Sequence, residues 1–246
     1  MAGLANSAIG RPAETSDQAN VLRAACRMPP LTRGAAARLR LQATIEEQPD
    51  EADDAAEHAP DIALRQSVTG RAESVWSFRN ERDAYTLATR ADTQRSQVDH
   101  TVEIQLVDMA FVRAIGGSGA RAGSAATAQA AAALRDRVNA VTNLNVTSAK
   151  VNNAKRGPFT AALNRLEKGR LRAVTIEQLA RQGKAKWLVD EGHWARIGSC
   201  AVQSYEATDA WLREGDRDAL PGSNELVVAT MDELQSIMQA VGIMER

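Results

Sequence analysis

Two short segments decide how this chain is interpreted: Val98-Asp99-His100, and Asn143-Leu144-Asn145-Val146-Thr147-Ser148-Ala149-Lys150-Val151-Asn152-Asn153-Ala154-Lys155. Adjacent residues of an extended strand face opposite ways, so Asp99 and His100 can do different tasks. A histidine titrates near neutrality and can deprotonate a water, whereas carboxylate and amide oxygens suit Mg²⁺. Asn152 and Lys155 share a face if their segment is helical. These residue types are the ones that cleavage of a phosphodiester needs.

The two segments resemble the HNH, or ββα-metal, endonuclease core. In that family a Val-Asp-His strand precedes Asn-Leu, and Asn-x-x-Lys follows on a helix. The resemblance implies that His100 is the general base, with Asp99 and Asn152 as ligands of Mg²⁺ or Mn²⁺. It also implies that Asn143 fixes the histidine loop through hydrogen bonds, and that Lys155 contacts backbone phosphate or braces the helix.

The chain departs from the family pattern in two places. The strand and the Asn-Leu segment are far apart, so residues 107–141 are expected to form a helical insertion. Ser148 and Val151 stand where many HNH proteins carry cysteines, so no structural zinc is expected. Glu103 falls on the Asp99 face of an extended segment, either as a further metal ligand or as the partner of a nearby arginine.

Basic residues gather immediately after the second segment. Only Glu167 and Glu177 oppose them between Asn143 and Leu188, although the net charge of the whole chain is −1. This clustering is typical of sequence-independent phosphate binding, and the alternative is a solvated helical surface. The basic residues are Lys150, Lys155, Arg156, Arg165, Lys168, Arg170, Arg172, Arg181, Lys184 and Lys186. Lys150, Lys155, Arg156 and Arg165 are the candidates for nucleic-acid contact, with DNA favoured over RNA.

Composition favours helices, because alanine is abundant and aromatic residues make up only 4% of the chain. The predicted fold class is α+β, mostly α, with a small ββα-metal core embedded in helices. Residues 1–60 are expected to form an N-terminal arm with an acidic linker. Residues 61–190 are expected to form the nuclease core, and residues 191–246 a C-terminal helical extension.

Local signals predict individual elements. Residues 61–90 are expected to be helical with a break at Gly70, and residues 104–112 and 125–141 to form helices, with a loop at residues 116–123. Thr147 or Ser148 is expected to cap a helix that stops near Gly157-Pro158. Capping boxes are predicted at Thr175 and at Thr230, the second opening a terminal helix. A helix is also expected over residues 31–45, and Trp76, Phe78 and Cys200 are expected to be buried.

No apolar run reaches the roughly 20 residues that span a bilayer, and the N-terminus lacks a signal-peptide core. A soluble intracellular protein without membrane partners is therefore expected. The function expected is that of a divalent-metal-dependent endonuclease with low sequence specificity. Two alternatives stay open: a nucleic-acid-binding module of the same fold that does not cut, and a helical adaptor that binds a protein partner through its C-terminal helices.

Overall fold

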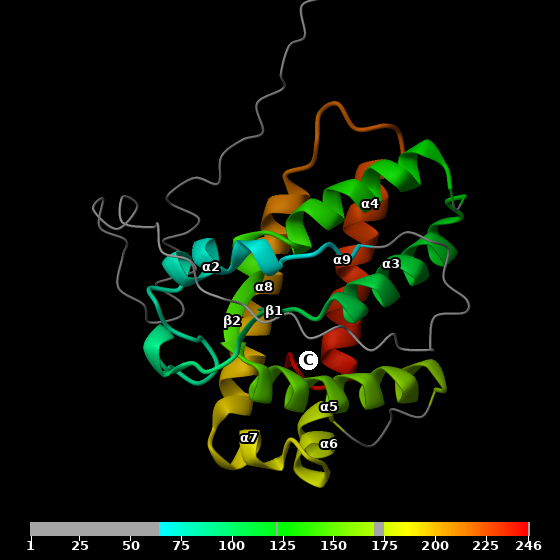
Figure 1. The fold of residues 1–246 in the computed structure, drawn as a ribbon. Coiled ribbons are helices and arrows are strands. Elements are labelled where there is room, and N and C mark those ends of the chain that lie inside the picture. Colours follow the sequence, from blue (N-terminus) through cyan, green and yellow to red (C-terminus); the bar gives the residue numbers. More distant parts are fainter. Residues whose placement is uncertain (1–63, 122, 170–174, 246) are drawn as a thin grey trace, which may run out of the picture.

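The computed structural model of the protein describes residues 64–121, 123–169 and 175–245. These residues are mostly helical and contain a single two-stranded sheet (Figure 1). The strands are β1 (Ser96–His100) and β2 (Leu144–Ser148). The helices are α2 (Ala72–Phe78), α3 (Ile104–Ser118), α4 (Ala125–Val138), α5 (Ala149–Glu167), α6 (Ile176–Gln182), α7 (Lys186–Asp190), α8 (His193–Arg213) and α9 (Ser223–Ala240).

The two strands pair antiparallel, with Asp99 opposite Asn145 and His100 opposite Leu144. This register puts Val98, Leu144 and Val146 on one face of the sheet, where they pack against Val75 and Trp76 of α2. The other face carries Asp99, and helix α5 lies on that side because Lys155 contacts Asp99. The sheet therefore has one apolar face under α2 and one polar face under α5.

The remaining helices pack around this sheet. Helix α3 lies along α9, which also contacts α4 and α8, and α6 connects α5 to α7 (Figure 1). The main core combines α3, α4 and α5 with α6, α8 and α9, and Leu134, Ile237 and Met238 are completely buried in it. The apolar residues of the two strands are not part of this core, because they form a separate, smaller cluster with α2.

Several predictions about local structure are confirmed. Ser148 caps α5 by accepting a hydrogen bond from Val151 N, and Thr175 opens α6 with a complete capping box. Trp76, Phe78 and Cys200 are buried, as expected. The predicted helix over residues 31–45, the acidic linker and the rest of the arm at 1–60 lie outside the described residues.

The expectation of a mostly helical segment over residues 61–90 is wrong. In the described part only α2, a short 3-10 turn at Thr69–Arg71 and the first residue of another at Arg90–Asp92 are helical. The chain then forms a loop in which Asn80, Glu81 and Leu87 adopt positive φ angles. Asp83 holds this loop, because its buried carboxylate accepts hydrogen bonds from the loop itself and from β2. Local side-chain hydrogen bonds therefore replace helical ones here.

Three predicted helix boundaries are also wrong. Helix α5 does not stop at Gly157-Pro158, since Pro158 lies inside it and the residues beyond, including Phe159 and Ala162, are buried. Helix α3 continues to Ser118, so the predicted loop at 116–123 begins only at Gly119. Helix α9 starts at Ser223, and Thr230 is an interior residue whose hydroxyl donates to the Leu226 carbonyl at 2.7 Å. No helix in the described ranges is long and apolar enough to cross a membrane.

Candidate functional site

The polar face of the sheet carries a buried cluster of charges centred on Lys155. Helix α5 directs the fully buried Lys155 ammonium at Asp99 Oδ2, and the two form an ion pair. Tyr85 is also fully buried, and its hydroxyl donates to the same Asp99 oxygen at 2.9 Å. Burial and the charge of Asp99 raise the pKa of Tyr85 well above its ordinary value, so the phenol stays protonated and donates.

Two further oxygens complete the surroundings of the Lys155 ammonium. Glu103 Oε1 lies 2.7 Å from Nζ, and the His100 carbonyl oxygen lies at 2.8 Å. An ammonium has three protons, and Lys155 donates hydrogen bonds to Asp99 Oδ2, to the His100 carbonyl and, at 3.4 Å, to the Tyr85 hydroxyl. Glu103 Oε1 pairs with the ammonium by charge and accepts no hydrogen bond from the described residues. Burial alone would lower the pKa of Lys155, but the two carboxylates raise it above its ordinary value. Burial raises the pKa of Glu103 above its ordinary value, although the positive charge of Lys155 acts to lower it.

His100 ends β1 and directs its ring to the opposite side of the strand from Asp99, as the strand period requires. Its Nε2 lies 3.0 Å from Oδ1 of Asn139, a buried residue at the end of α4. Burial lowers the pKa of His100, and the charges of Lys155 and Arg65 act in the same direction. The imidazole is therefore neutral at pH 7 and has a lone pair that can accept a proton.

Asn143 lies immediately before β2 and holds the turn that follows His100. Its Oδ1 accepts a hydrogen bond from Val102 N at 2.8 Å, and its Nδ2 donates to the Val138 carbonyl at 2.8 Å. Its backbone carbonyl accepts from Thr101 N at 2.8 Å. This one residue therefore joins the end of β1 to the end of α4 and the start of β2.

Asn152 lies one turn before Lys155 on α5. Its Nδ2 donates to Gln97 Oε1 at 3.1 Å, and Gln97 is on the same face of β1 as Asp99. Asn152 and Asp99 are thus on the same side of the sheet, although no direct contact joins them among the described residues. Glu103 lies beyond the end of β1, at the residue before α3, and forms a salt bridge with Lys155.

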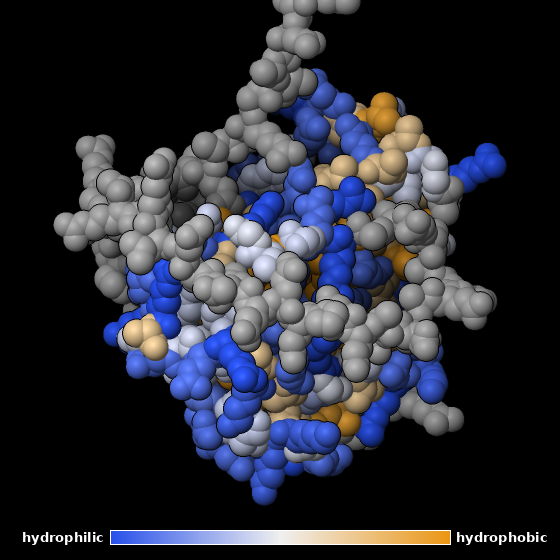
Figure 2. All heavy atoms as spheres, viewed as in Figure 1, coloured by the Kyte–Doolittle hydropathy of each residue, from blue (hydrophilic) through white to orange (hydrophobic). Residues whose placement is uncertain are grey.

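Of the residues expected to contact nucleic acid, Lys150 is exposed and Arg156 and Arg165 are partly exposed. Lys150 Nζ lies over the Trp187 ring, 4.2 Å from its centroid. Of the two roles expected for Lys155, the structure fits the bracing of the helix and not the phosphate contact, because the side chain is fully buried and its protons are directed at internal oxygens. Figure 2 shows hydrophilic residues over the lower part of the molecule, where Figure 1 places α6 and α7.

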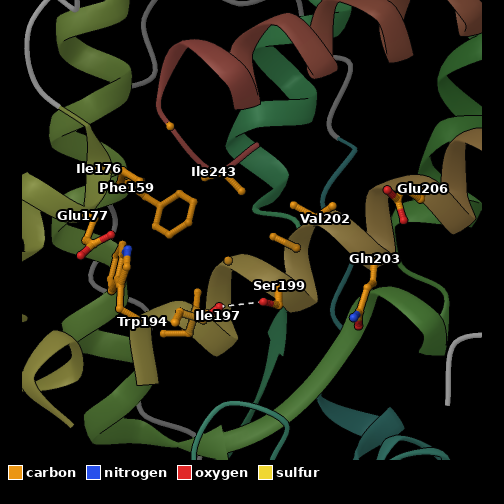
Figure 3. Close-up of a pocket in the computed structure, with 14 residues that line it drawn as sticks. Phe159, Ile176, Glu177, Trp194, Ile197, Ser199, Val202, Gln203, Glu206 and Ile243 are labelled. Carbon is orange, nitrogen blue, oxygen red and sulfur yellow. Dashed lines mark hydrogen bonds between the residues drawn. The ribbon is translucent and has the colours of Figure 1, made fainter. Parts of the chain in front are cut away.

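A separate pocket of about 520 Å³ lies where α5, α6, α8 and the residues after α9 meet. Figure 3 shows its apolar side chains, Phe159, Trp194 and Ile243, together with Glu177 and Glu206. Its charged residues are acidic, which disfavours a phosphate ligand. Phe159 follows Lys155 by one turn on the same face of α5, and Lys155 Nζ lies 5.7 Å from the centroid of its ring, so this pocket adjoins the buried cluster.

Tyr85 and Asn139 are two site residues that the sequence patterns did not indicate. Tyr85 contacts Asp99 from a loop that is attached to β2 by a hydrogen bond from Thr147 to the Asp83 carboxylate. Tyr85 and Asp99 are distant in the sequence, so no local sequence pattern predicts their contact. Asn139 stands at the C-terminal cap of α4, four residues before Asn143. An asparagine at a helix end is the weak signal that could have drawn attention to it.

Asp108 on α3 carries a testable pH dependence. Burial raises its pKa from 3.8 to about 6, against the charge of Arg65 and a hydrogen bond from Leu64 N. Because the folded-state pKa is raised, the stability linked to this proton is present below pH 4 and is lost as pH rises through about 6. We expect Asp108→Asn to raise the free energy of unfolding at pH 7 by about 1–3 kcal/mol. Urea unfolding at pH 4 and pH 7.5 measures this, and equal pH slopes for wild type and variant would contradict it.

Comparison with protein-family models, with curated proteins and with solved structures gave no match to this chain. The geometry of the site is therefore the basis for a functional proposal.

Proposed function

We propose that the protein is a divalent-metal-dependent endonuclease that hydrolyses phosphodiester bonds in DNA. One observation carries the proposal: β1, β2 and α5 form an antiparallel ββα unit in which a neutral histidine ends the first strand. Asn143 holds the turn after this histidine, which is the role that the HNH resemblance implies for it. In this proposal His100 removes a proton from the attacking water, and Asn143 keeps the strand end in place.

The donor chemistry of Asp99 and Asn152 fits a hard divalent cation. Within the described residues, the contacts of these two side chains use Asp99 Oδ2 and Asn152 Nδ2. Asp99 Oδ1 and Asn152 Oδ1 therefore accept no hydrogen bond among these residues and would be the ligand atoms, on the opposite side of the strand from the His100 ring. A site with one carboxylate, one amide and several waters is typical of Mg²⁺. Such an ion, when bound, would stabilise the negative charge that develops on the leaving oxygen.

Other residues of the site have supporting tasks in this proposal. Lys155 fixes the Asp99 carboxylate and the His100 carbonyl, so it sets the orientation of both neighbouring residues. Glu103 balances the charge of Lys155. Lys150, Arg156 and Arg165 on α5 would hold the phosphate backbone without reading bases, which predicts low sequence specificity and strong salt dependence.

The ion pair between Lys155 and Asp99 favours a second candidate function, binding of nucleic acid without cleavage. The ammonium already neutralises the carboxylate, so it competes with a metal for the same side chain. In this alternative the basic residues of α5 bind the backbone, and the buried cluster is structural.

Metal dependence separates the two candidates. We expect purified full-length protein to nick supercoiled plasmid in the presence of Mg²⁺ or Mn²⁺ and to be inactive in EDTA. Asn152→Ala should raise the metal concentration that gives half-maximal cleavage by about 10–100-fold, since it removes a ligand and leaves the base intact. Asn153→Ala, an exposed neighbour on α5, is the matched control. Cleavage of the plasmid that persists in EDTA would contradict the metal dependence of the proposed nuclease. Salt-sensitive binding without cleavage of DNA or RNA would favour the second candidate.

A further inference from the structure

The side chain of Asn139 has a fixed orientation, because its hydrogen-bond partners allow only one. Its Nδ2 lies 3.0 Å from the Leu64 carbonyl and 2.7 Å from the Arg135 carbonyl. Carbonyl oxygens only accept hydrogen bonds, so the atom facing both of them must be the NH₂ group. The oxygen Oδ1 therefore faces His100, and Asn139 is completely buried in this arrangement.

This orientation determines which nitrogen of the His100 ring carries the proton. Asn139 Oδ1 can only accept a hydrogen bond, and it lies 3.0 Å from His100 Nε2, so Nε2 must be the donor. A neutral imidazole has one N–H, and its other nitrogen is then an acceptor. The ring thus presents Nδ1 as the nitrogen with the available lone pair.

We propose that Asn139 is a positioning residue for His100, which fixes its ring and its tautomer so that Nδ1 is the atom that accepts the proton of the attacking water. This inference rests on the proposed function for its catalytic part. The backbone of Asn139 is held as well, because Arg71 donates to its carbonyl oxygen. Asn139 therefore connects the ring of His100 to α4, to the Leu64 segment and to the arginine before α2.

Two substitutions separate positioning from a merely structural role. The structural role of Asn139 depends on its donors to Leu64 and Arg135, whereas the positioning role depends on its acceptor to His100. Asn139→Asp keeps the acceptor and loses the donors, and Asn139→Leu loses both. Gln235→Glu makes the same amide-to-acid change on the remote helix α9 and is the control for added charge.

Per folded molecule, we expect Asn139→Asp to keep kcat within about 10-fold of wild type, and Asn139→Leu to lose about 100-fold with KM unchanged. Nuclear magnetic resonance gives a readout independent of activity. The hydrogen-bonded Nε2 proton of His100 should be visible and slow to exchange in wild type and in Asn139→Asp, and should be lost in Asn139→Leu.

The outcomes distinguish this inference from the proposed function. An Nδ1 proton on His100 in the wild type, or equal kcat losses in the aspartate and leucine variants, would overturn the positioning role of Asn139. If the expected proton signals are seen but the protein cleaves neither DNA nor RNA, Asn139 positions the His100 ring and the proposed nuclease function is wrong.

Discussion

Replacement of Lys155 by methionine is expected to lower the free energy of unfolding by about 3–5 kcal/mol. The side chains are similar in length, but methionine leaves the buried Asp99 carboxylate without its ion-pair partner, next to Glu103. Removing one member of a buried charge cluster costs much more than the cluster contributes to stability, because the remaining charges lie in a poorly polarisable interior. Urea unfolding at pH 7, followed by circular dichroism, measures the change.

Two further variants test the cause of that loss. Lys168→Met changes an exposed lysine at the end of α5 and should alter stability by no more than about 0.5 kcal/mol. The triple variant Lys155→Met, Asp99→Asn, Glu103→Gln removes the carboxylate charges together with the ammonium and should recover most of the loss. A loss below about 1 kcal/mol in Lys155→Met, or no recovery in the triple variant, would contradict a central role of this cluster.

The second large effect is expected for His100, the proposed general base. His100→Ala should lower kcat/KM for plasmid nicking by about 10²–10⁴-fold, the usual contribution of acid–base catalysis. DNA affinity should stay the same, since in the proposed mechanism the His100 ring accepts a proton and does not hold the phosphate backbone. Cleavage assays under Mg²⁺ and gel-shift assays in its absence separate the two effects.

The matched control for this variant is His193→Ala. His193 opens α8, where it contacts Arg196 and Glu191 and takes no part in the site. Its substitution should leave cleavage within a few-fold of the wild-type rate. A His100→Ala variant that cuts as fast as the His193 control would exclude His100 as the base, and DNA affinity lost together with cleavage would indicate a binding role.

The sequence predicted the mostly helical class and the elements that depend on neighbouring residues. The capping box at Thr175 was predictable because both of its hydrogen bonds join residues three positions apart. The same pattern gave a wrong prediction of a helix start at Thr230, whose hydroxyl donates a hydrogen bond to the Leu226 carbonyl within the same helix. A short polar motif cannot tell a helix start from a helix interior when apolar residues lie on both sides.

The site was predictable to the extent that its residues follow the strand and helix periods. Asp99 and His100 face opposite ways, and Lys155 comes from the same side of α5 as Asn152, as their spacing indicated. The interior position of Lys155 was not predictable, because it depends on Tyr85 and Glu103 arriving from separate segments. Buried polar contacts between distant segments leave no local pattern in a sequence.

The segment between the strands has a consequence for how the protein folds during synthesis. Strand β1 must wait for residues 101–143 to emerge before it meets β2, and α3 then finds its main partner in α9, close to the end of the described chain. The turn after His100 also contacts α8, where Thr101 Oγ1 lies 2.6 Å from Ser204 Oγ. A ribosome-bound fragment that stops before residue 223 contains α8 but lacks α9, the main partner of α3. The contacts of α3 with α9, and of the turn after His100 with α8, therefore form only after the residues that follow β2 have left the ribosome.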